Sequence, residues 1–355
     1  MTSLTSEARP ARRHFVLLVA LLAVTALPEV VPTAAAQARA SDRGAWEVPR
    51  TADGHPDLQG NWTNSTLTPF ERQEGRGPVF TWQEVAEIER GTEECPPNPG
   101  TVVCGRAPRQ GDSNEARLSG NEYNEVYWER GTRIAVVDGE PRTSLVTRPA
   151  SGRIPARTSG SQRALEDRQQ LRSRFGQYDH PELRPFAERC ILFGSPSGPP
   201  MIPVGAYNSN YIIVQTADHV MIQSEMIHDV RIIRIGEPDR LPKSVRPYFG
   251  DSWGRWEGDV LVVETTNISP EQSVAGGPLS ADAKVIERFT RVDEETILYE
   301  FTVDDPATFT EPWGGQIPIS MLHAELYEYG CHEGNYALEG VLRGARYEEA
   351  QAEEN

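Results

Sequence analysis

Basic residues are scarce in this chain relative to acidic ones. The 355 residues include 35 Lys and Arg against 52 Asp and Glu, which gives a formal net charge of −17 at pH 7. Nucleic acids and anionic membrane surfaces are bound through basic patches, so this balance argues against both as partners. We therefore expect a small organic molecule as ligand or substrate.

Long apolar runs are lacking beyond the N-terminus. The run at 15–27 (FVLLVALLAVTAL) is shorter than the about 20 residues of a membrane span. A basic leader precedes it and small residues follow, which is typical of a cleaved signal peptide. We expect residues 1–38 to be removed, with cleavage after Ala36 or Ala38, and the mature protein to be periplasmic or secreted with no membrane span. The stretch ARRHFVLL (11–18) also fits a twin-arginine signal, which stays open as the export route.

Cysteines are few, and their number is even. An even count in an exported protein indicates disulfides. The favoured pairs are Cys95–Cys104, which closes a short Pro/Gly-rich loop, and Cys190–Cys331, which ties the middle of the chain to its C-terminal part. A metal site is the alternative, but no C-x-x-C spacing supports it.

Several familiar catalytic motifs are absent. The chain has no Walker A loop, G-x-G-x-x-G turn, H-E-x-x-H helix or C-x-x-C-H haem site. Nucleotide-dependent enzymes and zincins are therefore poor candidates. We expect no cofactor. A bound metal is an alternative, through His228 with Glu225 or through His332 with Glu333.

Helical periodicity is scarce, and most of the chain alternates apolar and polar residues with period two. Segment 81–91 has a capping box, with Thr81 and Glu84 three residues apart. Segment 159–175 has strong helix formers but a thin apolar stripe, which indicates an exposed helix. Strands or hairpins are predicted at 123–128, 133–139, 142–148, 210–227, 229–236, 259–267, 284–305 and 325–330.

These patterns predict an all-β fold, either a lipocalin-like barrel or a sandwich, with a few peripheral helices. We expect one β-rich domain over 39–355, with a loop- and helix-rich part at about 80–190. Two Gly-x-Trp units, at 60–62 and 254–256, precede strands. Lipocalin-like barrels begin with a similar unit whose Trp plugs one end of the barrel, although a Trp before a strand is often an ordinary core residue.

The first candidate site is the segment SEMIHDVRIIR, with Glu225, His228 and Asp229 as catalytic candidates and Arg231 as a ligand-binding candidate. A His beside a carboxylate can act as general acid or base. On a regular strand, Glu225 and His228 would face opposite sides, so a shared site requires a bulge or bend near His228. The alternative is an exposed strand edge with an Asp–Arg ion pair.

The second candidate site is YGCHEGNY, with His332 and Glu333 as catalytic candidates and Asn335 as a ligand-binding candidate. A disulfide at Cys331 would exclude it as a nucleophile but would hold His332 and Glu333 in place. The alternative is a simple turn in which Gly334 takes a positive φ.

Two further segments have the composition of a pocket rim, although each can also be an ordinary turn. The ligand-binding candidates in them are Asp251 and Arg255 in YFGDSWGRWEGD, and Tyr207, Asn208, Asn210 and Tyr211 in AYNSNYIIVQT.

Five segments together resemble a group of secreted bacterial proteins, found in soil and marine bacteria, that carry no assigned activity. The segments are HPDLQGNWTN, EMIHDVRIIRI, GDSWGRWEGDVLVVETTN, ERFTRVDEETILYEFTVDDP and YGCHEGNYALEG. The resemblance implies an exported bacterial protein, and it transfers no functional residue.

Three function classes follow. The favoured one is an exported enzyme that acts on a small organic substrate by His/carboxylate acid–base chemistry, as a hydrolase, lyase, isomerase or cyclase. The second is a non-catalytic, lipocalin-like carrier of an apolar or amphipathic ligand. The third is an envelope-associated protein that binds another protein by a strand edge.

Overall fold

The computed structural model describes residues 46–93, 129, 131–203, 207–237 and 239–354. The chain divides into a first unit, Met1–Trp46, and a second, Glu47–Asn355, which contains every helix and strand given below. The expected signal peptide and the pair Cys95–Cys104 lie outside the described residues. Among the helices that are described, none is long and apolar enough to cross a membrane.

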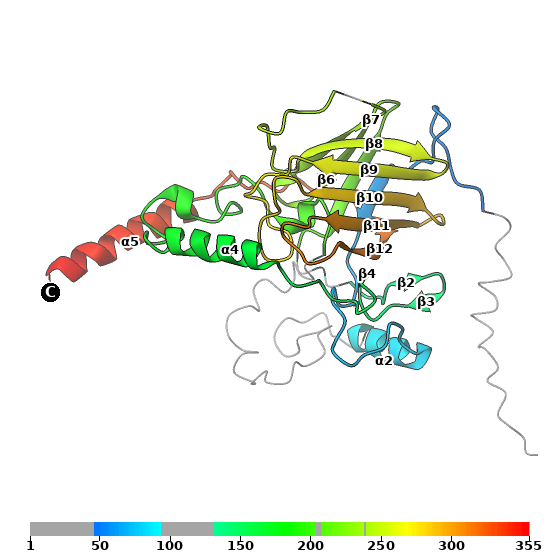
Figure 1. Cartoon of the computed structure of the whole chain (residues 1–355), viewed down its shortest axis with the longest axis horizontal. Helices are drawn as coiled ribbons and strands as arrows, with labels where there is room; N and C mark the ends of the chain where they lie inside the picture. Colours follow the sequence, from blue (N-terminus) through cyan, green and yellow to red (C-terminus); the bar gives the residue numbers. More distant parts are fainter. Residues whose placement is uncertain (1–45, 94–128, 130, 204–206, 238, 355) are drawn as a thin grey trace, which may run out of the picture. The chain divides into compact units, whose positions relative to one another are not determined.

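A closed β-barrel dominates the structure (Figure 1). Nine of the described strands follow one another around it in the order β1-β5-β6-β7-β8-β9-β10-β11-β12, and a short antiparallel pairing of β1 with β12 closes the ring. The expected all-β fold is confirmed, and the barrel is the alternative that the chain adopts.

The barrel strands are β1 (Gly60–Thr63), β5 (Asn210–Gln215), β6 (His219–Ser224), β7 (Val230–Ile235), β8 (Asp251–Glu257), β9 (Val260–Thr266), β10 (Lys284–Arg291), β11 (Thr296–Asp304) and β12 (Trp313–Met321). Outside the ring, β4 (Val146–Arg148) pairs with the start of β12, and β2 (Val136–Val137) with β3 (Glu140–Pro141) forms a small separate hairpin. The 3₁₀ turns are η2 (Pro181–Leu183), η3 (Ser195–Ser197) and η4 (Met226–His228).

Alternation of buried and more exposed residues sets the two faces of strands such as β11. In β11, Ile297, Tyr299, Phe301 and Val303 are buried, and the residues between them are half-exposed. Successive strand residues point to opposite faces, so one set fills the barrel and the other faces outward. The hairpin turns also form as predicted, with Gly258 at φ 61° between β8 and β9.

One pairing in the ring is parallel, between β7 and β8. Because parallel neighbours need a crossover, the chain returns along the barrel, with residues 236–237 and 239–250 described, before β8 begins. Asp251 holds this return loop: its carboxylate accepts the Leu241 amide at 2.8 Å and pairs with Arg234. Asp251 is buried and has these structural partners.

Chain segments cover both ends of the barrel. At one end the indole Nε1 of Trp62 donates to the Leu58 carbonyl at 2.9 Å, and the Leu58 amide donates to Gln215. Leu58 and Trp62 are fully buried. At the other end, residues 196–202 are buried, and the Met201 amide donates to the Tyr299 hydroxyl inside the barrel.

The described helices lie outside the barrel ring. They are α2 (Trp82–Glu93), α4 (Ser159–Arg172) and α5 (Ala337–Glu354). The predicted capping box of α2 is present, since Thr81 N donates to Glu84 Oε2 at 2.8 Å and Glu84 N to Thr81 Oγ1 at 3.2 Å. Helix α4 has no buried residue, as expected, and its N-cap is Thr158.

Two local predictions differ from the structure at the C-terminal end. Segment 325–330 was expected as a strand and forms none, because no neighbouring strand offers it a partner. Helix α5 was not predicted. It is exposed along most of its length, and its half-buried residues Leu338, Leu342 and Ala345 follow helical spacing, a pattern that the sequence interpretation missed.

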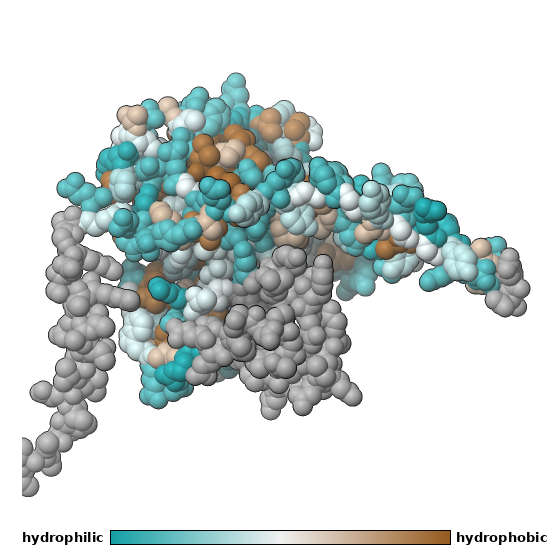
Figure 2. Space-filling view, turned by 180° about the vertical axis from the view of Figure 1, so that it is seen from behind, coloured by the Kyte–Doolittle hydropathy of each residue, from teal (hydrophilic) through white to brown (hydrophobic). Residues whose placement is uncertain are grey.

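The outer wall of β5–β7 carries apolar side chains. Val214, Met221 and Ile232 are neighbours across the three strands, and Val214 and Ile232 are 40% and 49% exposed. Figure 2, which views the molecule from behind, shows hydrophobic residues gathered on the upper part of the barrel.

Candidate active site

The bend that a shared site would require near His228 is present. Between β6 and β7 the chain leaves the strand conformation, with Ile227 at φ 62° and His228 at φ 46°. The loop closes by a hydrogen bond from Ser224 N to the Asp229 carbonyl at 2.8 Å. Positive φ is unfavourable for a β-branched residue, so surrounding contacts must hold it. Ile227 is buried, and the Met226 amide donates to Asn208 Oδ1 at 2.8 Å.

Asp229 anchors the segment that covers this end of the barrel. Its Oδ2 accepts the Ser197 hydroxyl at 2.8 Å and the Phe193 amide at 3.1 Å. Asn208 completes the network by donating to Ser197 Oγ at 3.2 Å. Burial raises the pKa of Asp229, and these hydrogen bonds and the neighbouring His228 offset part of that effect. The carboxylate is 8% exposed and therefore has little surface left for a ligand.

Two carboxylates meet at the amide of Asn210, beside this loop. Asn210 Nδ2 donates to Glu225 Oε2 at 3.2 Å and also to Glu129 Oε1. Glu129 and Glu225 are both half-buried, and both are hydrogen-bonded to one nitrogen, so they are near neighbours. Among the described residues, the buried Oε2 of Glu129 has no hydrogen-bond partner.

The environment of this pair favours protonation. Burial raises the pKa of Glu129, the charge of Glu225 raises it further, and hydrogen bonds from Asn210 and the Ser209 backbone lower it in part. Burial likewise raises the pKa of Glu225 above its ordinary value. Two carboxyl groups that share a site cannot both ionise freely, so one of them retains a proton to higher pH.

Arg231 and Tyr211 face the inside of the barrel. Arg231 is 3% exposed, and its guanidinium binds both oxygens of Glu287, at 2.5 and 3.0 Å. The Tyr211 hydroxyl donates to the Pro196 carbonyl at 2.8 Å and accepts from Asn64 at 3.0 Å. The Asp–Arg pair considered from the sequence does not form, because Arg231 pairs with Glu287 instead.

The second predicted cluster is held by the expected disulfide. Cys190 and Cys331 are bonded, with Cα atoms 5.7 Å apart. Asn335 Nδ2 donates to the Glu188 carbonyl at 3.1 Å, and Gly334 takes a positive φ of 71°. His332 and Glu333 are exposed on this turn.

The disulfide links the second cluster to the chain segment that contacts Asp229, but it does not join the two clusters directly. Cys190 lies three residues before Phe193, whose amide binds Asp229. In the part of the chain that is described, however, no hydrogen bond or ion pair joins Glu225, His228 or Asp229 to His332 or Glu333. His228 is itself exposed.

The remaining predicted residues occupy turns or surface pairs. Tyr207 is half-buried in the turn before β5. Arg255 is exposed and pairs with Glu257 at 2.6 Å. Trp256, of the second Gly-x-Trp unit, stacks on His55 with ring centroids 4.7 Å apart. Within the described ranges, no three His, Cys, Asp or Glu side chains are placed to hold a metal ion.

Glu129 was missed by sequence reasoning. It lies 81 residues before Asn210, and no local pattern links the two. A carboxylate that follows a predicted strand has many possible partners, and only the folded barrel selects one.

Comparison with known proteins gives no match: no family model, no curated protein and no solved structure resembles the chain. The resemblance to secreted bacterial proteins therefore stays a prediction.

Proposed function

We propose that this protein is an enzyme that transfers protons on a small organic substrate, with Glu129 and Glu225 as the acid–base pair. The observation that supports this proposal is the pair itself, in which two half-buried carboxylates with raised pKa values are hydrogen-bonded to one amide. Groups with shifted pKa values are common at catalytic sites, because a general acid must stay protonated near the working pH.

The two carboxylates are assigned different roles. Glu129 feels the charge of Glu225 as well as its own burial, so in this proposal it holds the proton and acts as the acid. Glu225, which has a regular hydrogen bond from Asn210 at 3.2 Å, acts as the base. Asn210 positions both. Such a pair serves hydrolysis, dehydration, isomerisation or cyclisation equally, since each needs one positioned acid and one base.

His228 and Asp229, which the sequence suggested as catalytic residues, take supporting positions in this proposal. Asp229 fixes the β6–β7 loop through Ser197 and Phe193, and the loop in turn places Glu225. His228 is exposed on the same loop and adds positive charge near Asp229 when protonated.

We favour an enzyme over a lipocalin-like carrier because side chains occupy the centre of the barrel. Arg231 and Glu287 bind each other there, and the Tyr299 hydroxyl donates to Glu287 at 2.8 Å. All three residues are almost fully buried. A carrier would need that volume for its ligand.

The first test is a carboxyl titration by NMR with ¹³C-labelled glutamate. Glu129 and Glu225 should titrate above the ordinary pH range of a glutamate side chain. Replacing Glu225→Gln should lower the pKa of Glu129, because a like charge is removed. The proposal fails if Glu129 and Glu225 both titrate within the ordinary range.

The second test looks for turnover without a known substrate. A panel of carbonyl compounds, esters, lactones and glycosides is incubated with the protein in D₂O and in H₂¹⁸O, and mass changes are recorded. Any activity found should fall by about 100-fold or more in Glu129→Gln and in Glu225→Gln. Glu294→Gln, at an exposed position in the β10–β11 turn, is the matched control and should retain it. Full activity in the double variant Glu129→Gln/Glu225→Gln would contradict the assignment.

A further inference from the structure

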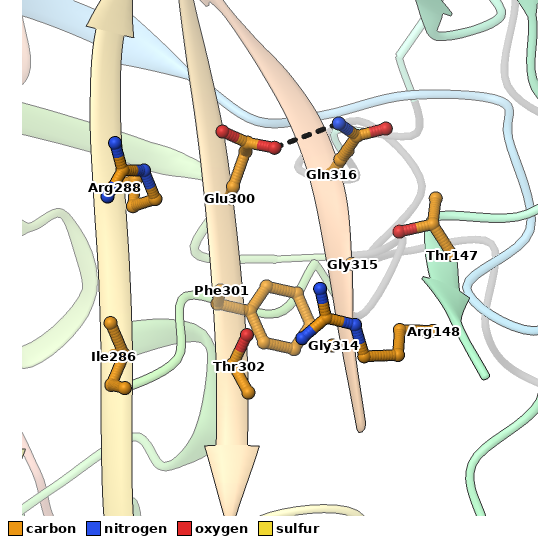
Figure 3. Close-up of a pocket in the computed structure, with 10 residues that line it drawn as sticks. All are labelled: Thr147, Arg148, Ile286, Arg288, Glu300, Phe301, Thr302, Gly314, Gly315 and Gln316. Atoms are coloured by element: carbon orange, nitrogen blue, oxygen red, sulfur yellow. Dashed lines mark hydrogen bonds between the residues drawn. The ribbon is translucent and has the colours of Figure 1, made fainter. Parts of the chain in front are cut away.

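A polar groove lies on the outer wall of the barrel, where β10, β11 and β12 meet β4 (Figure 3). Its volume is about 260 Å³, just below the usual range for drug-sized ligands. The residues that line it are Thr147, Arg148, Ile286, Arg288, Glu300, Phe301, Thr302, Gly314, Gly315 and Gln316.

The strand register explains why this wall is hollow. Outward residues form two rows across the strands, and the first is Arg288–Glu300–Gln316. The second row runs from Ile286 through Thr302 to Gly314, where the side chain is missing.

Glycine is required at the hollow. A Cβ on Gly314 would lie 2.0 Å from the Phe301 carbonyl oxygen, and one on Gly315 would lie 2.5 Å from the Leu145 carbonyl oxygen. Both contacts are far inside van der Waals distance. The close approach of β4 and β11 to β12 thus excludes side chains and leaves a pocket beside Arg148, which pairs with Gly314 in register.

The groove offers one unpaired cation. Arg148 is exposed, and within the described residues its guanidinium makes no hydrogen bond or ion pair. Arg288, across the groove, pairs with Glu257 of β8, which also pairs with Arg255 of the same strand. A planar guanidinium with free donors binds a carboxylate in two-pronged fashion. Because the chain has a net charge of −17, it repels anions as a whole, and an anion needs a local cation such as Arg148 to bind.

The rest of the lining suits hydroxyl groups. Glu300 accepts from Gln316 Nε2 at 2.9 Å, which leaves one carboxylate oxygen and the Gln316 carbonyl oxygen as acceptors. Thr147 and Thr302 add hydroxyls that both donate and accept. Ile286 supplies an apolar surface for C–H groups.

We propose that this groove is a binding site for a small hydroxylated carboxylate of the sugar-acid type, with its carboxylate on Arg148 and its hydroxyls on Glu300, Gln316 and Thr302. The groove shares no residue with the Glu129–Glu225 pair. Binding there is therefore independent of the proposed acid–base activity.

Isothermal titration of the purified protein with glucuronate tests the proposal. We expect a Kd of about 1 mM or tighter, and binding of glucose at least about tenfold weaker because it lacks the carboxylate. An oligomer of galacturonate tested alongside distinguishes the source: tighter binding of the oligomer indicates a polysaccharide, and tighter binding of the monomer indicates a free acid. Either result supports the site.

Two variants connect the binding to this groove. Arg148→Gln should weaken glucuronate binding by about tenfold or more, because it removes a charge-assisted contact. Thr302→Phe should abolish it by filling the hollow, and an aromatic residue on the outer face of a strand is well tolerated. Arg153→Gln is the control, since Arg153 is also exposed and does not line the groove.

Three results would overturn the proposal. The first is the absence of binding by glucuronate and by the oligomer. The second is unchanged binding in both Arg148→Gln and Thr302→Phe, when melting curves show that these variants are folded. The third is inorganic phosphate binding as tightly as glucuronate, which would mean that the groove attracts anions without recognising hydroxyls.

Discussion

Arg231 and Glu287 form a fully buried ion pair inside the barrel, although their strands, β7 and β10, are separated by two others in the ring. The pair therefore joins distant parts of the wall across the interior. Tyr299 adds a hydrogen bond to Glu287, and burial together with the charge of Glu287 raises the pKa of Tyr299 far above its ordinary value.

Breaking this pair should be costly. Glu287→Leu leaves the Arg231 charge buried without a partner, so we expect a loss of about 3–5 kcal/mol in the free energy of unfolding. The double variant Arg231→Met/Glu287→Leu should lose less, because neither charge is then buried. Urea unfolding measures both. Glu339→Gln, in the exposed pair with Arg343, should change stability by less than about 0.5 kcal/mol. A double variant as unstable as the single one would contradict this account.

The two half-buried carboxylates should make the stability of the protein increase as the pH is lowered, and this increase should be smaller when both are replaced. Glu129 and Glu225 have folded-state pKa values raised above the unfolded ones, so their protonated forms favour folding. That contribution is fully present below the unfolded pKa and is lost as pH rises through the folded pKa. As the pH is raised from about 4 to 7, the melting temperature should fall less in Glu129→Gln/Glu225→Gln than in the wild type. Parallel curves for the two proteins would exclude the effect.

The backbone conformation at position 228 should decide which substitutions the protein tolerates there. Its φ of 46° is unfavourable for β-branched side chains, so His228→Val should lower the free energy of unfolding by about 1–2 kcal/mol. Because Asn adopts this conformation readily, His228→Asn should be nearly neutral. His219→Val is the control, since His219 lies in the regular strand β6 where valine is favoured. Equal effects of Val at the two positions would mean that the loop relaxes.

The disulfide should stabilise the chain as a whole. Cys190 and Cys331 are 141 residues apart, so the bond restricts a long loop in the unfolded state. The double variant Cys190→Ala/Cys331→Ala should lose about 2–5 kcal/mol, measured by urea unfolding. Hydrogen exchange should also speed up in the segment 331–336. An unchanged unfolding midpoint would show that the bond only tethers the surface turn to residues 187–190.

Elements whose signals are local were predictable from the sequence. The capping box of Thr81 and Glu84, the hairpin turn at Gly258 and the alternation in β11 each depend on residues within one element. Helix α5 and the segment 325–330 were misjudged because an exposed helix and an unpaired strand-like run have ambiguous patterns.

For the candidate site, the sequence indicated Glu225, Asn210 and the need for a bend near His228. It could not indicate Glu129, because the contact with Asn210 spans 81 residues. It also could not show whether Asp229 would pair with Arg231, which instead reaches Glu287.

The sequence by itself determined the all-β class and the turns, since these follow from periodicity and turn chemistry. It favoured the Cys190–Cys331 pair among three possible pairings, and the tertiary structure shows that bond. Only the tertiary structure decided which carboxylates meet at Asn210, where Arg231 finds its partner, and that Gly314 opens a groove in the wall. Barrel closure joins Trp62 of β1 to Met321 of β12. Strand register across such separations is set by packing of the whole interior, and no local pattern encodes it.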